Sequence, residues 1–71
     1  MRLIRLKEVM STTGLSRSSI YKYIGEDRFP ASVSLGDRAV AWVESEVLNW
    51  MEVVVARRDD NVLSGYGKGD A

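Results

Sequence analysis

At 71 residues, with ten Lys and Arg balancing ten Asp and Glu, the chain is one small domain that can enclose only a limited core. It contains no cysteine and no histidine, which excludes a disulfide framework, a zinc site and catalysis by a thiol or an imidazole. No apolar run approaches the roughly 20 residues of a membrane span, and no signal-peptide pattern opens the chain. We therefore expect a cytoplasmic protein that is not an enzyme, with no membrane association, no metal and no cofactor.

The balanced charge hides two unlike halves. Residues 1–38 carry seven Lys and Arg against four Asp and Glu, a net charge of +3. Residues 39–71 carry three Lys and Arg against six Asp and Glu, a net charge of −3. This polarity indicates a polyanionic partner on the N-terminal side.

The first predicted element after a short extended segment at residues 2–5 is a short helix. Leu6, Val9 and Met10 recur at the i, i+3, i+4 spacing of one helical face. The run from Ser11 to Gly14 supplies the polar and glycine residues that end helices. The pattern therefore predicts a helix of about two turns.

A second helix is predicted directly after this turn. Ser16 is a candidate N-cap whose hydroxyl accepts from a backbone N–H two or three residues on, and Leu15 can pack on Ile20 as a hydrophobic staple. Helical spacing then divides the side chains into two faces. The inward face is predicted to hold Ile20, Tyr23 and Ile24. The outward face is predicted to hold Arg17, Ser18, Tyr21 and Lys22.

A β-hairpin is predicted next, after Gly25 weakens the helix, Asp27 closes it in the left-handed conformation and Pro30 turns the chain. Hydrophobic residues alternate with serines or alanines on either side of a tight turn at 36–38, which is typical of two paired strands. An isolated hairpin is marginally stable in water. One face must therefore pack on the helices, with Trp42 as the anchor.

The last predicted helix spans residues 44–58, with Glu44 and Glu46 in its first turn and Arg57 and Arg58 in its last, as the helix dipole favours. Apolar residues cover most of its surface between 47 and 55, more than so small a body can bury. We expect self-association through residues 47–55. Residues 59–71 show no periodicity and are predicted to be a disordered tail after a single domain at 1–58.

Together these elements predict an α+β, mostly α fold: a small winged helix-turn-helix with a two-stranded β-hairpin wing and a longer C-terminal helix. The second helix of such a motif enters the major groove of double-stranded DNA. Arg17 in its first turn can reach a guanine edge, and Ser18 allows close approach. Tyr21 and Lys22 suit phosphate or base contacts. Four further residues, at the helix start, on the first helix, in the loop and on the wing, are predicted to contact DNA: Ser16, Lys7, Arg28 and Arg38.

The residues also carry a family resemblance. The run RLIRLKEVMSTTGLSRSSIYKYI, the tripeptide RFP, the hairpin VSLGDRAVAW and the helix start ESEVLNWM closely resemble the AlpA family of prophage regulatory proteins over residues 2–52. The resemblance implies a small DNA-binding protein with an excisionase-like, MerR-like winged helix. It implies DNA contacts on the helix from Ser16 to Ile24 and on the wing around Arg38. It also implies a transcriptional regulator, often of an integrase, or an excision factor that works with one.

Three interpretations of function stay open at this point. The first is a transcriptional regulator of a prophage or integrative element, nucleoid-associated when bound to DNA and acting on an integrase gene. The second is an excisionase that binds attachment-site DNA. The third is a protein-interaction module that uses the apolar last helix. A comparison of promoter or attachment-site DNA with a scrambled duplex discriminates the third from the other two.

Overall fold

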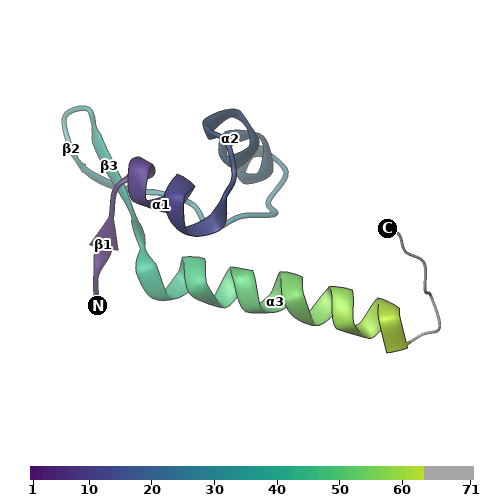
Figure 1. The fold of residues 1–71 in the computed structure, drawn as a ribbon. Coiled ribbons are helices and arrows are strands. Elements are labelled where there is room, and N and C mark those ends of the chain that lie inside the picture. Colours follow the sequence, from purple (N-terminus) through teal and green to yellow (C-terminus); the bar gives the residue numbers. More distant parts are fainter. Residues whose placement is uncertain (64–71) are drawn as a thin grey trace.

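The computed structural model describes residues 1–63, with side chains as far as residue 59, and this part of the chain forms three helices and three short strands (Figure 1). In chain order they are β1 (Leu3–Ile4), α1 (Leu6–Thr13), α2 (Arg17–Gly25), β2 (Val33–Gly36), β3 (Ala39–Val43) and α3 (Glu44–Leu63). The predicted fold class is confirmed, with two short helices, a β2–β3 hairpin and a longer C-terminal helix.

The sheet has one strand more than the predicted hairpin. Its order is β1-β3-β2 with both pairs antiparallel. The central strand β3 therefore pairs with β2 in the hairpin and with β1 on its other edge. On one side Ile4 lies opposite Trp42, and on the other Val33 lies opposite Ala41, with a bulge between Ser34 and Gly36. The two-stranded hairpin is present as predicted, and residues 2–5 were expected only as an extended segment, because two residues are too few to show an alternating pattern.

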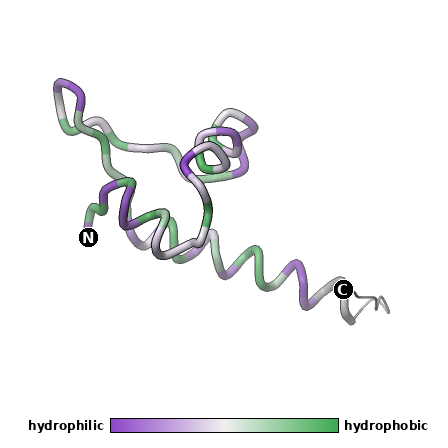
Figure 2. Tube along the Cα trace, turned by 45° about the horizontal axis from the view of Figure 1, so that its top comes forward, coloured by the Kyte–Doolittle hydropathy of each residue, from purple (hydrophilic) through white to green (hydrophobic). Residues whose placement is uncertain are grey.

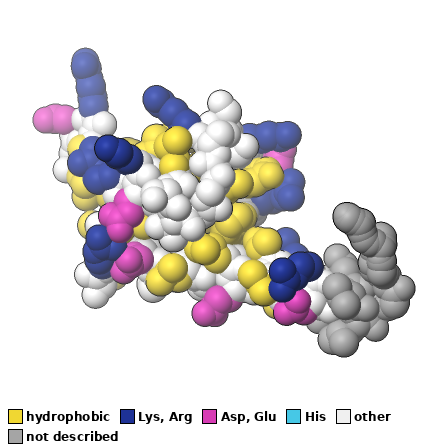
Figure 3. Space-filling model, in the orientation of Figure 1, with side chains coloured by type: hydrophobic (Ala, Val, Ile, Leu, Met, Phe, Trp, Pro, Cys, Tyr) yellow, Lys and Arg dark blue, Asp and Glu magenta, His cyan; other side chains and the backbone are white. Residues whose placement is uncertain are grey.

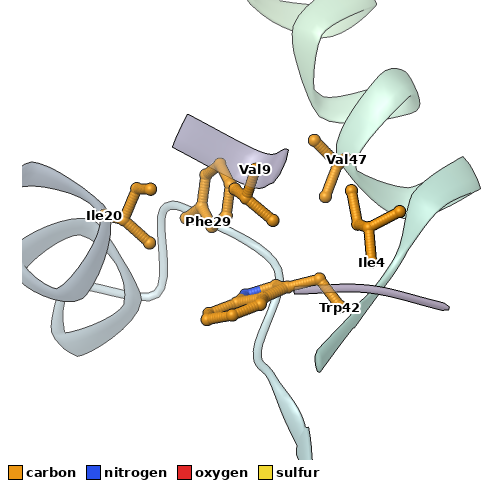
Figure 4. Close-up of a cluster of buried hydrophobic side chains, with 6 residues drawn as sticks. All are labelled: Ile4, Val9, Ile20, Phe29, Trp42 and Val47. Carbon is orange, nitrogen blue, oxygen red and sulfur yellow. The ribbon is translucent and has the colours of Figure 1, made fainter. Parts of the chain in front are cut away.

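The core takes one residue from every element except β2 and one from the loop before β2: Ile4, Val9, Ile20, Phe29, Trp42 and Val47 (Figure 4). Trp42 is the largest of these and is completely buried, as predicted for the anchor of the hairpin. Its indole points from β3 toward Ile20 of α2, and its Nε1–H donates to the Pro30 carbonyl at 3.1 Å. Because buried polar groups need partners, this bond also fixes the loop that joins α2 to β2.

The boundaries of α1 and α2 follow local backbone rules. Gly14 ends α1 in the left-handed conformation (φ 78°), and its N–H donates to the Met10 carbonyl at 2.8 Å. Asp27 adopts the left-handed conformation (φ 58°) after α2, which confirms the prediction for this residue. The N–H of Arg28 then donates back to the Tyr23 carbonyl at 2.8 Å and closes the helix.

The strand β2 has the predicted position and is the exposed strand of the hairpin. All four of its residues are exposed, with Val33 at 39% and Leu35 at 47%. Trp42 on β3, by contrast, is buried among the helices. The hairpin therefore rests on the body through its second strand and extends β2 into solvent.

The predicted end of the last helix at Arg58 was wrong, because α3 continues to Leu63. The predicted tail overlaps this helix at residues 59–63, and its remainder lies outside the described residues. Figure 1 shows the second half of α3 projecting beyond α1 and α2. Within residues 1–63, no helix has the length and hydrophobicity needed to cross a bilayer.

A surface network around Arg2 joins the beginnings of three elements. Its guanidinium lies 2.8 Å from Glu8 of α1 and 2.6 Å from Glu44 of α3, and its carbonyl accepts from the N–H of Glu44 at 2.8 Å. Hydrogen bonds to Glu8 and Glu44 raise the pKa of Arg2 above its already basic value. Arg2 therefore keeps its positive charge throughout the working range of pH.

Candidate nucleic-acid interface

The helix α2 divides into the two faces predicted from its sequence. Ile20 is fully buried, and Tyr23 and Ile24 pack against the core. The opposite face exposes Arg17, Ser18, Tyr21 and Lys22. Figure 2 shows that hydrophilic and hydrophobic residues alternate along α2, as expected for a helix with one polar and one apolar face. The predicted orientation is confirmed, and a polar surface of Arg, Ser, Tyr and Lys is free to meet a partner.

Ser16 caps the start of this helix as predicted. Its hydroxyl oxygen accepts from the backbone N–H of Ser19 at 3.1 Å and donates to the Ser19 hydroxyl at 3.0 Å. An N-cap bond of this kind typically contributes about 1 kcal/mol to helix stability. The Ser16 hydroxyl therefore already makes two hydrogen bonds to Ser19. A contact with DNA would require the same hydroxyl to keep the capping bond and bind DNA as well.

Tyr21 connects the exposed face to the core. Its ring meets the indole of Trp42 edge-on, at 6.4 Å between centroids, while 43% of the residue stays exposed. The guanidinium carbon of Arg17 lies 5.9 Å from the centroid of the same ring. Cations at this range are attracted by the ring quadrupole. Tyr21 thus limits the freedom of Arg17 one turn earlier on the helix.

The structure engages Arg28 in contacts within the chain. Its guanidinium lies 4.8 Å from the ring centroid of Tyr23 and 3.0 Å from a carboxylate oxygen of Glu26. Both contacts hold the side chain at the C-terminal end of α2. Part of the charge predicted for DNA is therefore neutralised by Glu26.

Other cations of the N-terminal half have no such neutralisation. Within residues 1–59, no carboxylate oxygen lies within 4.0 Å of the side-chain nitrogens of Lys7, Arg17, Lys22 or Arg38. All four residues are exposed. They come from α1, the two ends of the exposed face of α2, and the turn between β2 and β3.

Arg5 is a further cation near this surface that the sequence analysis did not single out. Its Nε donates to the carbonyl of Val40 on β3 at 2.9 Å, and the residue is exposed. This bond holds the guanidinium beside the hairpin and leaves its two terminal nitrogens available. The only sequence signal was its charge, because the bond spans 35 positions.

Many of the basic side chains lie on the side of the molecule formed by α2 and the hairpin (Figure 3). In Figure 3, Lys and Arg side chains project from the hairpin tip and from α2, on the side away from α3. Figure 2 shows the hairpin tip as hydrophilic. In the view of Figure 3, acidic side chains lie along α3 together with some basic ones, and one acidic side chain projects at the hairpin tip. The molecule therefore presents a basic side built from α2 and the wing.

Comparison with known proteins gives a family and two relatives. The family model described as Prophage CP4-57 regulatory protein (AlpA) matches residues 2–55. The chain is 51% identical over 57 residues to the uncharacterized protein ORF88 of Enterobacteria phage P4, covering 80% of this chain and 65% of that protein. It is 32% identical over 56 residues to the DNA-binding transcriptional activator AlpA of Escherichia coli K12, covering 70% of this chain and 80% of that protein. The match thus spans just under two thirds of the phage protein.

Proposed function

Because this chain belongs to the AlpA family of prophage regulatory proteins, we propose that it binds specific sequences of double-stranded DNA and regulates transcription from a prophage or integrative element. The observation that carries the proposal is the exposed face of α2. That face presents Arg17, Ser18, Tyr21 and Lys22 on a helix whose other face is anchored in the core. The name of the Escherichia coli relative supports the same activity.

The dimensions of the helix suit the major groove. An α-helix with side chains is about 10–12 Å across, and the major groove of B-DNA is about 12 Å wide. In this arrangement Arg17 donates two hydrogen bonds to a guanine, and Ser18 lets the helix approach the bases closely. Tyr21 and Lys22 lie one turn further on and contact phosphates or bases. The contact of Arg17 with Tyr21 supports this assignment, because a restrained side chain loses less entropy on binding.

The wing and the first helix supply phosphate contacts in this proposal. Arg38 at the hairpin tip reaches the neighbouring minor groove or backbone, and Lys7 and Arg5 reach flanking phosphates. None of these three has a carboxylate partner among residues 1–59. Binding to a phosphate therefore breaks no ion pair within the described chain. We assign Arg28 a smaller part, because it already pairs with Glu26.

A selection from random duplexes tests sequence-specific binding and identifies the target sequence in the same experiment. Full-length protein is used to enrich duplexes from a random library, and the recovered sequence is compared with its scrambled form at physiological salt. We expect a recovered motif and a large preference over the scrambled duplex. Failure to enrich any motif would contradict the proposal and favour the protein-interaction module.

We propose further that the regulated gene encodes an integrase. Footprinting across the integrase promoter and the attachment sites, with and without integrase, tests this. Protection at the promoter together with a change in transcription supports regulation of the gene. Protection confined to the attachment sites, with stimulated excision, would assign the same DNA-binding face to an excision factor.

A further inference from the structure

A groove with an apolar floor runs along one side of α3. It has a volume of about 770 Å³ and lies between the helix and the loop before β2. Its apolar lining includes Phe29, Val33, Trp50, Val53 and Val54. Val33, Val53 and Val54 are each about 40% exposed, so the groove places three valine side chains in contact with water among polar neighbours.

The part of α3 beside this groove is poorly suited to stand alone. Val53, Val54 and Val55 are three consecutive β-branched residues, which lower helix propensity by restricting their side-chain rotamers. In Figure 1 this half of α3 projects past the body. Helices in proteins owe most of their stability to packing, so a covering partner is expected here.

Charges at the two ends of the groove indicate what covers it. Glu46 lines one end and Arg57 the other, and both are exposed. Within residues 1–59 neither has an opposite charge within 4.0 Å. They are eleven positions apart, which is about three helical turns, so they lie on the same face of α3. On the α3 side of the groove, an acid at one end and a base at the other are complementary to a second copy turned end for end, while Asp27 and Arg28 line the loop side.

We propose that this groove binds α3 of a second copy of the chain in antiparallel orientation, with Glu46 of each copy facing Arg57 of the other. An antiparallel pair centred between residues 51 and 52 also brings Trp50 of one copy beside Val53 of its partner. The result is an apolar centre with an ion pair at each end. In this arrangement the first half of the partner's α3 lies beside the second half of α3, the half that extends past α1 and α2 in Figure 1.

A second apolar stripe on α3 serves as an internal comparison. It contains Leu48, Met51 and Val55 and lies on another side of the helix. The charged residues beside it, Glu52 and Asp59, are both acidic. Asp59 already pairs with Arg58 at 3.0 Å, and within residues 1–59 Glu52 has no cation beside it on this stripe, so pairing two copies here offers no ion pair between them. The charges therefore favour the groove over the stripe for self-association.

The test measures the oligomeric state of the full chain by sedimentation at high micromolar concentration. The wild type should dimerise. Val53→Glu places a charge in the groove and should leave only monomer, whereas Val55→Glu makes the same change two positions away and should dimerise like the wild type. Both valines are exposed, at 40% and 47%, so both variants should fold, which circular dichroism can verify.

A charge exchange tests the antiparallel register. Glu46→Arg brings two like-charged pairs together and should weaken dimerisation by at least about tenfold. Adding Arg57→Glu to the same chain restores opposite charges and should restore the dimer. A monomeric wild type, equal effects of the two valine substitutions, or a double variant as weak as Glu46→Arg would each overturn the proposal. A monomeric wild type would leave the groove to another partner.

Discussion

The ring of Tyr21 meets the buried indole of Trp42 edge-on, with 6.4 Å between the ring centroids and 64° between the planes. Removal of the ring by Tyr21→Ala should lower the free energy of unfolding by about 1–2 kcal/mol, since the aromatic pair and some apolar burial are lost. Tyr21→Phe keeps the pair and should change stability little. Urea denaturation of both variants measures the difference, and equal stabilities would show that the aromatic contact contributes nothing.

Replacement of Arg17 should change the specificity of DNA binding. If its guanidinium reads a guanine, Arg17→Ala should lose about 1–3 kcal/mol on the selected sequence and less on random duplex. Binding titrations on both duplexes measure this. Arg58→Ala is the control, because Arg58 lies on α3 and pairs with Asp59 at 3.0 Å. An equal loss on both duplexes would reassign Arg17 to a phosphate.

Replacement of Lys22 should instead weaken binding to every sequence alike. A phosphate contact contributes through counterion release, so Lys22→Ala should reduce the slope of log affinity against log salt by about one. Lys22→Arg should keep the slope of the wild type. Titrations at several salt concentrations test this, and a loss limited to the selected sequence would make Lys22 a base contact.

Arg38 and Arg28 should respond differently to the same substitution. Arg38 is exposed in the turn of the wing, so Arg38→Ala should weaken DNA binding with little change in stability. Arg28 lies over Tyr23 and pairs with Glu26, so Arg28→Ala should cost about 0.5–1 kcal/mol of stability and affect DNA binding less. Parallel denaturation and DNA titrations compare the two. The reverse ranking in DNA affinity would show that Arg28 leaves Glu26 when DNA binds.

Substitution of alanine at Gly14 and at Gly25 should change the free energy of unfolding in opposite directions. A Cβ at either Gly14 or Gly25 would meet nothing within 4 Å, so only the backbone conformation distinguishes them. Gly14 has φ 78°, and Gly14→Ala should destabilise by about 1–2 kcal/mol. Gly25 is helical, and Gly25→Ala should stabilise by up to about 1 kcal/mol. Thermal or urea denaturation compares them, and a shared sign would contradict this explanation.

Local rules account for what could be predicted from the sequence. The cap at Ser16, the end of α1 at Gly14 and the left-handed Asp27 each depend on interactions within about four residues. The inward face of α2 follows from helical periodicity, so Ile20 was assigned correctly to the core. The same helical periodicity also determines which residues lie on the exposed face of α2, so that face could be predicted from the sequence.

Contacts between distant segments account for what was missed. The pairing of β1 with β3 joins residues about forty positions apart. A strand of two residues is too short to show the alternating hydrophobic pattern by which strands are recognised. The backbone at Arg28 likewise depends on distant packing, since its carbonyl accepts from the indole of Trp50 at 2.6 Å. Its guanidinium, by contrast, contacts the nearby Glu26 and Tyr23. The length of α3 was underestimated because the charges at 57–60 resemble a helix end, although α3 continues through them.

The junction between the sheet and the last helix has a mechanical consequence. β3 ends at Val43 and α3 begins at Glu44, so no linker residue separates them. The wing and α3 are therefore expected to move as one rigid unit, with a fixed angle between them. In two chains joined through α3, this stiffness fixes the separation of the two wings. Such a pair would accept operator repeats only within a narrow range of helical phasing, so lengthening the spacer by half a turn of DNA should abolish joint occupancy.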